Sequence, residues 1–399
     1  MRTSARHRAK IFCALIAGAL MTIGGTAPAP PAFSAPADSV PHIVSSETVH
    51  TSVVALDAAS STTRIRYRST SVRGTPTEMT GTVLLPRSAP PRDGWPLAVW
   101  NHMTVGAADS CAPSGGHAGH PELPRMTSGD LIVSHLLDAG FAVVRPDFEG
   151  IGGPGPHPYL IGDSLARSTI DMAVAASRED SRIGRDVVVA GHSEGAVAAL
   201  FAASRPESEW RGLQLRGVAA LAPPTQVARM LDAVSAVPVA GPAINELMGL
   251  AALIGYGAAA ADPDFGQLML NGGLSPAARR LVPQVEQRCY VGLTGFDSFG
   301  GLAPAQLLGP RGSQLKTDLM SILDRNDVAH LRFSPGLPVR VEAGTTDTVS
   351  PQPLVSELVQ TYRRAGVRVT YNERLIGHAG VATEPGGAEG VARWLIRQV

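Results

Sequence analysis

The feature that most constrains the fold of this chain is the sequence Gly-His-Ser-Glu-Gly at residues 191–195, a G-x-S-x-G motif. It directly follows an apolar segment at 186–190, which is typical of a buried strand, and it opens an apolar helix expected to end near residue 203. The backbone of such a corner is crowded, so the glycines make room while the serine takes a strained conformation that lifts its hydroxyl above the sheet. The bare motif also arises by chance in a chain with 43 glycines, and its position between strand and helix is what predicts Ser193 as a nucleophile.

Strand and helix patterns alternate on both sides of this corner. Two antiparallel strands are expected between about residues 64 and 86, followed by an apolar run that ends near Asn101. Further predicted strands are 141–144, 186–190, 217–221, 337–343 and 367–371, and predicted helices are 131–139, 164–178, 193–203 and 352–365. This alternation requires right-handed crossovers, which predicts the α/β class, with a mostly parallel central sheet and helices on both faces.

The alternation breaks between Pro223 and His330, where the sequence consists of helical pieces, including an Ala-, Leu- and Gly-rich stretch at 243–261. We therefore predict a core in two parts, residues 38–224 and 331–399, with a helical cap or lid inserted at residues 225–330. Its apolar composition fits either a buried helical subdomain or a cap whose apolar underside lines an acyl pocket. Asn245 and Glu246 argue against a membrane span.

A serine hydroxyl is a poor nucleophile at neutral pH and needs a base, which in turn needs a carboxylate to hold its tautomer. In the chain order of α/β-hydrolases the base comes last, and His330 and His378 are the two histidines after Ser193. His378 lies in a loop of small residues after the last predicted strand, so we predict it as the base. His330 precedes the strand expected to supply the acid, and we interpret it as a structural or cap residue.

Asp347 is the predicted acid, because it lies in the loop after the strand at 337–343, whose end carries it to the same edge of the sheet. Glu342 lies within that strand, and Asp324 and Asp327 precede it. An alternative interpretation makes Asp347 the cap of the helix that begins near Gln352, since aspartate is common at helix starts.

When the nucleophile attacks, the carbonyl carbon becomes tetrahedral and negative charge develops on its oxygen, which fixed N–H donors must stabilise. The backbone of Glu194, directly after the nucleophile, is one predicted donor to this oxyanion hole. The second is expected in the loop after Trp100, from the main chain of Met103 or Thr104. His102, in the same loop, is as readily a structural residue.

Residues 100–106, 147–160, 191–195 and 344–347 resemble the secretory lipase family of α/β-hydrolases (yeast lipase A-like). The similarity extends from about residue 40 to the C-terminus, and Gly-Pro-His-Pro-Tyr-Leu at 155–160 is its most distinctive part. The resemblance implies an α/β-hydrolase fold with an inserted helical cap, and an exported esterase or lipase that uses Ser193, Asp347 and His378. Two residues depart from the family pattern. Met103 replaces a usual glycine, and Glu194 stands where glutamine or glycine is more familiar.

These residues lead to the hypothesis of a carboxylic ester hydrolase, a lipase or esterase that cleaves acylglycerols or other apolar acyl esters through an acyl-enzyme on Ser193. The alternative is a peptidase or an acyltransferase with the same triad, because the fold alone excludes neither. A non-catalytic binding protein is a third hypothesis, and the presence of serine, aspartate and histidine together argues against it. The expected partner is a small-molecule ester or lipid.

The pattern of residues 1–37 predicts a signal peptide. Four basic residues, the last of them Lys10, precede an apolar run at 11–24 that is too short for a bilayer span, and small-residue cleavage sites follow. We expect a secreted, extracellular protein that starts at Asp38, has no stable membrane anchor and makes at most transient contact with a lipid interface. Its mild net negative charge predicts no nucleic-acid binding.

Cys111 and Cys289 follow the predicted signal peptide, and an oxidising compartment favours a disulfide between them over the alternative of two buried free thiols. His117 and His120 suggest a metal site, but no third ligand stands at a suitable spacing, so a solvated loop is the preferred interpretation. The sequence contains no nucleotide-binding motif. We expect no metal and no cofactor.

Overall fold

A computed structural model describes residues 40–50, 53–235 and 237–399 of the chain. The predicted signal peptide, residues 1–37, lies outside the described residues.

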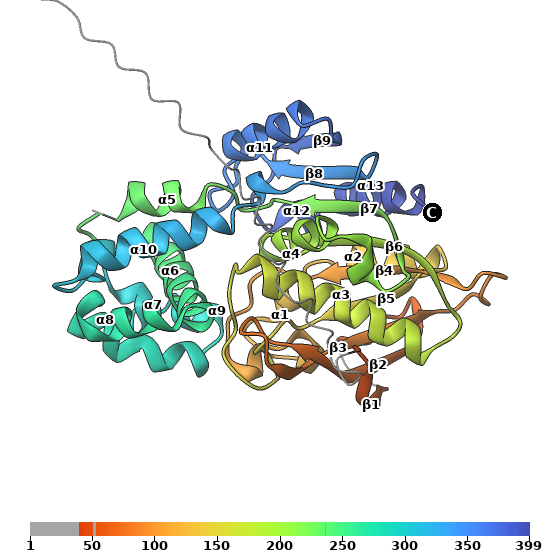
Figure 1. Ribbon diagram of the computed structural model, residues 1–399, viewed down its shortest axis with the longest axis horizontal. Coiled ribbons are helices and arrows are strands. Elements are labelled where there is room, and N and C mark those ends of the chain that lie inside the picture. Colours follow the sequence, from red (N-terminus) through yellow and green to blue (C-terminus); the bar gives the residue numbers. More distant parts are fainter. Residues whose placement is uncertain (1–39, 51–52, 236) are drawn as a thin grey trace, which may run out of the picture. The chain divides into compact units, whose positions relative to one another are not determined.

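The centre of the fold is a nine-stranded sheet with the strand order β1-β2-β3-β5-β4-β6-β7-β8-β9 (Figure 1). The pairs from β1 to β3 and the pair β3–β5 are antiparallel, and every pair from β5 to β9 is parallel. The predicted mostly parallel sheet is therefore confirmed, and the sequence interpretation missed β1. The strands are β1 (Ile43–Val49), β2 (Ala59–Thr70), β3 (Pro76–Pro86), β4 (Trp95–Asn101), β5 (Ala142–Pro146), β6 (Ile183–His192), β7 (Gln214–Leu221), β8 (Pro338–Gly344) and β9 (Arg368–Arg374).

Helices cover both faces of this sheet, because side chains of a strand alternate between its two sides. In β6, Val187 and Val189 face one hydrophobic cluster, which contains α3 (Gly162–Glu179), α4 (Glu194–Ala203) and α11 (Gln352–Arg364). Val188 and Ala190 face the other, which contains α2 (Asp130–Asp138), α12 (Gly380–Thr383) and α13 (Pro385–Ile396). Because both faces of these strands are buried, their sequences are continuous runs of apolar residues.

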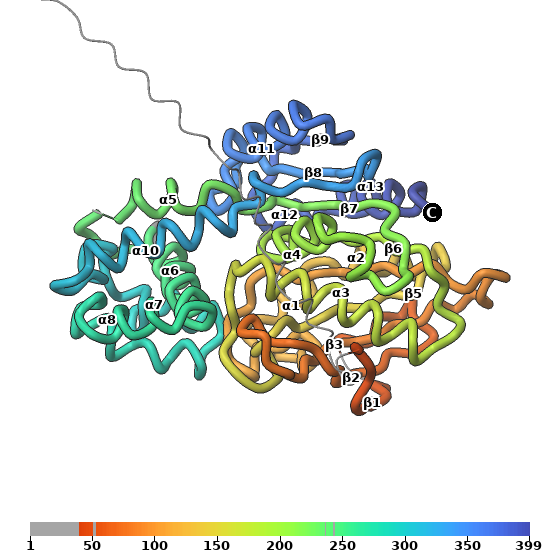
Figure 2. The backbone as a smooth tube through the Cα atoms, in the orientation of Figure 1, coloured from red at the N-terminus to blue at the C-terminus, as the bar shows by residue number. Residues whose placement is uncertain are grey.

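Between β7 and β8 the chain forms the helical segment, which we define as residues 227–330 (Figure 2). Its helices are α5 (Val227–Val234), α6 (Pro242–Ala261), α7 (Pro263–Leu268), α8 (Pro276–Leu281), α9 (Tyr290–Leu293) and α10 (Gly312–Arg325). Within α6, the stretch Ile244–Ala261 is long and apolar enough to cross a membrane by length and composition, and 44% of it is buried inside the protein. Leu253, Ile254 and Ala258 of this helix join the hydrophobic clusters, which is the position of an internal helix.

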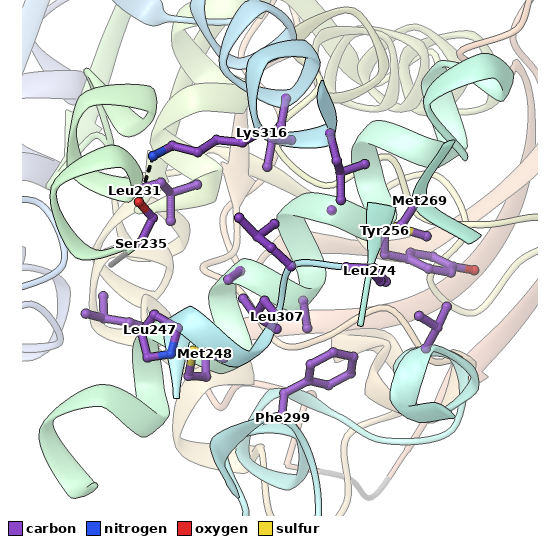
Figure 3. A pocket seen from close by; sticks show the side chains of 18 of the residues that line it. Leu231, Ser235, Leu247, Met248, Tyr256, Met269, Leu274, Phe299, Leu307 and Lys316 are labelled. Carbon is purple, nitrogen blue, oxygen red and sulfur yellow. Dashed lines mark hydrogen bonds between the residues drawn. The ribbon is translucent and has the colours of Figure 1, made fainter. Parts of the chain in front are cut away.

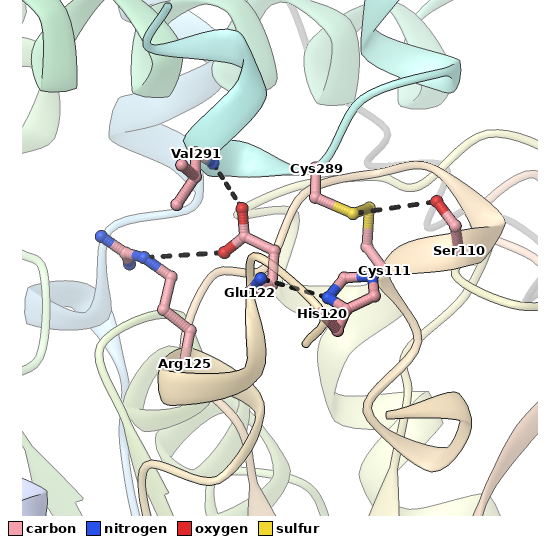
Figure 4. Close-up of a disulfide and its surroundings, with 7 residues drawn as sticks. All are labelled: Ser110, Cys111, His120, Glu122, Arg125, Cys289 and Val291. Carbon is pink, nitrogen blue, oxygen red and sulfur yellow. Dashed lines mark hydrogen bonds and ion pairs between the residues drawn. A yellow bond between two sulfur atoms is a disulfide. The ribbon is translucent and has the colours of Figure 1, made fainter. Parts of the chain in front are cut away.

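The predicted disulfide between Cys111 and Cys289 is confirmed, so the alternative of two free thiols is wrong (Figure 4). The Cα atoms of the two cysteines are 5.5 Å apart, and 178 residues separate them in sequence. Cys111 lies in the loop region after β4, and Cys289 directly precedes α9. The bond therefore joins the helical segment to the loop that follows β4.

Candidate active site

The corner between β6 and α4 presents Ser193 in a strained backbone conformation, with φ of 57° and ψ of −119°. Both glycines of the motif are required by close contacts. A Cβ atom on Gly191 would lie 2.0 Å from the carbonyl oxygen of Gly195, and one on Gly195 would lie 2.1 Å from that of Asn101. The backbone N–H of Ser193 donates to the carbonyl of Leu221 in the neighbouring strand β7, which holds the corner against the sheet.

Ser193, His378 and Asp347 meet at the carboxyl edge of the sheet, after β6, β9 and β8 respectively. His378 Nε2 lies 2.8 Å from Ser193 Oγ, and His378 Nδ1 lies 2.7 Å from Asp347 Oδ2. Because a carboxylate only accepts hydrogen bonds, Nδ1 carries the proton, and Nε2 presents its lone pair to the serine hydroxyl. The arrangement can take a proton from Ser193 and stabilise the charge that results on the imidazole.

The other oxygen of the Asp347 carboxylate accepts the backbone N–H groups of Val349 and Ser350, each at 2.8 Å. The Asp347 side chain is fully buried. Its Oδ2 accepts from His378, and its Oδ1 accepts from the two backbone N–H groups. The residue at the N-cap of α11 is Pro351, so Asp347 does not cap that helix. His330 stands apart from this group, with 60% of its side chain exposed and Asp324 as its neighbour.

His192, inside the motif, supports the loop that carries His378. Its Nε2 donates to the carbonyl of His378 at 2.9 Å, and its Nδ1 accepts from the hydroxyl of Ser128 at 3.0 Å. Burial, followed by the proximity of His378, holds the pKa of His192 well below its usual value, so the ring is neutral. Sequence reasoning missed this residue, since nothing in its local pattern indicates a contact 186 residues away.

Two oxyanion donors are predicted, the N–H of Glu194, which directly follows Ser193, and that of Met103 or Thr104 in the loop after β4. Within the described residues, the N–H groups of Met103, Thr104 and Glu194 donate no hydrogen bond to another group of the chain. The side chains around them are engaged. Thr104 Oγ1 and the Tyr159 hydroxyl are 2.8 Å apart, and His102 Nδ1 donates to the carbonyl of Met103 at 2.7 Å. Burial lowers the pKa of His102, which favours a neutral ring.

The loop after β4 is also bound to the helical segment. The backbone N–H of Tyr290 donates to the carbonyl of Val105 at 2.9 Å, and Gly106 forms an isolated antiparallel bridge with Cys289, next to the disulfide. On the other side of the disulfide, Glu122 accepts the N–H of Val291 and pairs with Arg125 at 3.7 Å (Figure 4). Burial raises the pKa of Glu122 to about 7, although both contacts favour the charged form.

An apolar cavity of about 120 Å³ lies within the helical segment (Figure 3). Its walls come from α5, α6, α7 and α10 and the turns between them, and include Leu231, Met248, Phe299 and Leu307. Lys316 is its one charged lining residue, and its ammonium group donates to Ser235 at 2.8 Å and pairs with Asp232 at 2.6 Å. Ser193, Asp347 and His378 are not among the residues that line it.

The rings of His117 and His120 lie 5.2 Å apart, centroid to centroid, and His120 Nδ1 accepts the N–H of Glu122. The described residues contain no group of three or more histidine, cysteine, aspartate or glutamate side chains placed to hold a metal ion.

A family model described as secretory lipase matches residues 125–398. Lipase A of Arthroderma benhamiae is 25% identical over 351 residues, which cover 84% of this chain and 70% of that protein. A protein of Mycobacterium tuberculosis named "probable inactive lipase" is 23% identical over 342 residues, which cover 84% of this chain and 72% of that protein.

Among solved structures, lipase A of Candida antarctica in its closed state matches with a TM-score of 0.69 and 18% identity, covering 84% of this chain and 77% of that one. The rice cell wall degrading esterase LipA of Xanthomonas oryzae matches with a TM-score of 0.64 and 19% identity, covering 89% of this chain and 96% of that one. These structures are α/β-hydrolases, and the predicted α/β-hydrolase fold is confirmed.

Proposed function

This chain belongs to the secretory lipase family, and from that premise we propose that Ser193, His378 and Asp347 hydrolyse carboxylic esters through an acyl-enzyme. As a member of that family, the protein is a carboxylic ester hydrolase of the lipase or esterase class, and its substrates are small-molecule esters or lipids. The observation that carries the proposal is the pair of hydrogen bonds, 2.8 Å and 2.7 Å long, that joins the three side chains.

In the proposed reaction, Ser193 Oγ attacks the ester carbonyl while its proton passes to His378 Nε2. The negative charge on the carbonyl oxygen is met by the N–H of Glu194 and by that of Met103 or Thr104. The tetrahedral intermediate then breaks its bond to the alcohol oxygen, which takes the proton from His378 and leaves. A water molecule, deprotonated by His378, attacks the acyl-enzyme and releases the carboxylic acid, and Asp347 keeps the imidazole in one tautomer throughout.

The test is reaction of the protein with p-nitrophenyl butyrate and with a fluorophosphonate that labels activated serines. We expect a burst of p-nitrophenol, and one label per chain located at Ser193. Ser193→Ala loses the label and about 10³- to 10⁶-fold in kcat, whereas Ser208→Ala, at an exposed position, keeps both. Wild-type kcat in Ser193→Ala contradicts the proposal. Peptide substrates and alcohol acceptors in the same assay report the peptidase and acyltransferase alternatives.

We further propose that the helical segment acts as a cap and that its cavity receives the apolar part of the substrate. The lining is almost wholly aliphatic and aromatic, and the segment adjoins the oxyanion loop through Tyr290 and Cys289. An apolar site of this kind favours a hydrocarbon chain over a polar group. Ala251→Leu narrows the cavity, so the ratio of decanoate to butyrate hydrolysis is expected to fall. Ala233→Leu, on the exposed side of α5, is the matched control, and an equal ratio in both variants contradicts this placement.

We also propose that residues 1–37 are a signal peptide and are removed on export to the extracellular space. The secretory character of the family supports export, and the basic and then apolar order of these residues supports the mechanism. No stable membrane anchor, nucleic acid or cofactor is part of the proposal. N-terminal sequencing of the exported protein is expected to start at Asp38, and an intact Met1 on that protein contradicts the proposal.

A further inference from the structure

Behind the nucleophile lies a buried ion-pairing contact that the proposed reaction does not use. His157, in the distinctive stretch at 155–160, is completely buried, and its Nε2 lies 2.8 Å from Oε1 of Glu194. The Glu194 side chain is 1% exposed, and its residue directly follows Ser193. Two ionisable groups are thus in contact at the residue whose backbone N–H is a predicted oxyanion donor.

The hydrogen bonds of His157 determine how many protons the pair holds. Its Nδ1 lies 2.8 Å from the backbone carbonyl of Glu149, and a carbonyl only accepts, so Nδ1 carries a proton. In a neutral ring, Nε2 then has only a lone pair to offer. A carboxylate oxygen also has only lone pairs, and two acceptors 2.8 Å apart without water repel each other. One further proton must therefore lie between Glu194 and His157.

With this proton the pair has no net charge, whether the proton resides on the imidazole or on the carboxyl group. Without it, the pair carries one negative charge in a buried position next to the N–H of Glu194. Negative charge develops on the substrate oxygen at that N–H in the proposed reaction, and charges of the same sign repel strongly where water is excluded.

We propose that His157 and Glu194 form a positioning pair whose shared proton keeps the oxyanion site free of opposing charge and orients the N–H of Glu194. This inference rests on the proposed function, since it concerns the same nucleophile. The proposal gives a function to residues 155–160, which include His157 and have no part in the proposed reaction.

The acidic side chains nearest to the pair are occupied by other partners. The ring of Phe148 stacks on that of His157, at 6.3 Å between centroids, and lies tilted against that of His102, at 4.3 Å. The carboxylates of Asp147 and Glu149 flank Phe148 in the chain. Each is held elsewhere: Glu149 by the N–H of Val72 and the hydroxyl of Ser164, and Asp147 by Thr80 and Ser114. Glu194 also interacts electrostatically with His102 and with the Tyr159 hydroxyl, and His157 with Glu149.

His157→Gln removes the shared proton but keeps a hydrogen-bond donor for the carboxylate. We expect kcat for p-nitrophenyl butyrate to fall about 10- to 100-fold with little change in KM, because the buried carboxylate of Glu194 then carries a charge that no shared proton offsets. In the double variant His157→Gln with Glu194→Gln, the amide carries no charge, and kcat is expected to recover most of this loss. A loss of packing alone predicts no such recovery.

Glu194→Gln on its own supplies a second readout. Its amide donates to Nε2 of a neutral His157 without a shared proton, so the alkaline decline of kcat is expected to shift to higher pH. His330→Gln, at an exposed histidine, is the matched control and leaves the profile in place.

A folded His157→Gln protein with wild-type kcat at all pH values overturns the proposal. If that variant shows no cooperative melting, Glu194→Gln decides alone, and an alkaline decline identical to that of the wild type overturns it. Labelling of the wild type by fluorophosphonate separates this failure from failure of the proposed function. Label at Ser193 with either negative result rejects only the His157–Glu194 pair, whereas absence of label rejects the nucleophile itself.

Discussion

Two buried regions of the molecule differ in chemistry. The region around His157 and Glu194 contains hydrogen-bonded polar side chains, whereas the interior of the helical segment is apolar. Near the sheet, the buried side chains of His157, Glu149 and Ser168 each meet a polar partner. Within residues 227–330, among those whose burial is described, Ser298 is the one buried polar side chain, and the interior holds an apolar cavity instead. Hydrogen bonds fix direction, whereas apolar packing depends mainly on volume. The polar region is therefore suited to direct proton transfer, and the interior of the helical segment is suited to accept an apolar group.

The largest effect on activity is expected from a substitution in the polar region, at Asp347. In Asp347→Asn the amide oxygen takes over the N–H groups of Val349 and Ser350, which turns the NH2 group toward His378 Nδ1. The imidazole must then carry its proton on Nε2 and loses the lone pair that accepts from Ser193, so kcat is expected to fall about 10⁴-fold.

Steady-state kinetics with p-nitrophenyl butyrate measure this loss, and circular dichroism spectra check that the fold persists. Asp324→Asn, at an exposed acid, serves as the control. If Asp347→Asn turns over the ester at the wild-type rate, another residue must be the acid.

The junction of the two regions gives the next largest effect. Replacing both Cys111 and Cys289 by alanine opens a covalent link across 178 residues, and the chain-entropy model gives a loss of about 5 kcal/mol in the free energy of unfolding. Urea unfolding of both proteins measures the difference. Equal midpoints at equal slopes show that the backbone contacts at Val105 and Gly106 suffice to hold the segment.

A smaller, pH-dependent effect is expected at Glu122, which links the same regions by a hydrogen bond. Its pKa of about 7 in the folded protein exceeds the value of 4.5 expected for the unfolded chain, so its protonated form stabilises the fold below pH 4.5, and this contribution is lost as the pH rises through 7. Glu122→Gln keeps the acceptor for Val291 without ionising. The stability of the variant relative to the wild type should therefore rise by roughly 2–3 kcal/mol across that window.

Urea unfolding at several pH values between 4.5 and 8 tests this expectation. Glu207→Gln, at an exposed acid, is the reference. Stability curves of Glu122→Gln and the wild type that run parallel over the whole range contradict the titration of Glu122 in this window.

The smallest effects sharpen the comparison within one helix, α6. A Cβ atom on Gly255 faces the cavity and meets only Met269 Sδ, at 3.9 Å, so Gly255→Ala is expected to stabilise the protein by about 1 kcal/mol through its higher helix propensity. A Cβ atom on Gly257 faces the core and would lie 2.4 Å from the backbone of Tyr159, so Gly257→Ala should destabilise by about 1–3 kcal/mol. Thermal melting compares the two variants, and a shift of the same sign in both contradicts this orientation of α6.

Much of the architecture was predictable because its causes are local. The two-residue and 3.6-residue periods of apolar side chains indicated the strands and helices around Ser193. Strand β1 was not predicted because most of its residues are exposed, so its sequence has no apolar pattern. The motif at 191–195 indicated Ser193 because it stands between an apolar strand and an apolar helix, and chain order narrowed the base to His378 and the acid to Asp347.

The sequence alone determined which residue types this protein carries, in what order, and which segments become strands and helices, because those depend on neighbours along the chain. The tertiary structure alone decided which distant groups touch. His192 and His378 are 186 residues apart, Glu122 and Val291 are 169 apart, and Glu194 meets His157 across 37. No local pattern encodes such contacts, because they arise only when buried polar groups must find partners as the sheet and helices pack together.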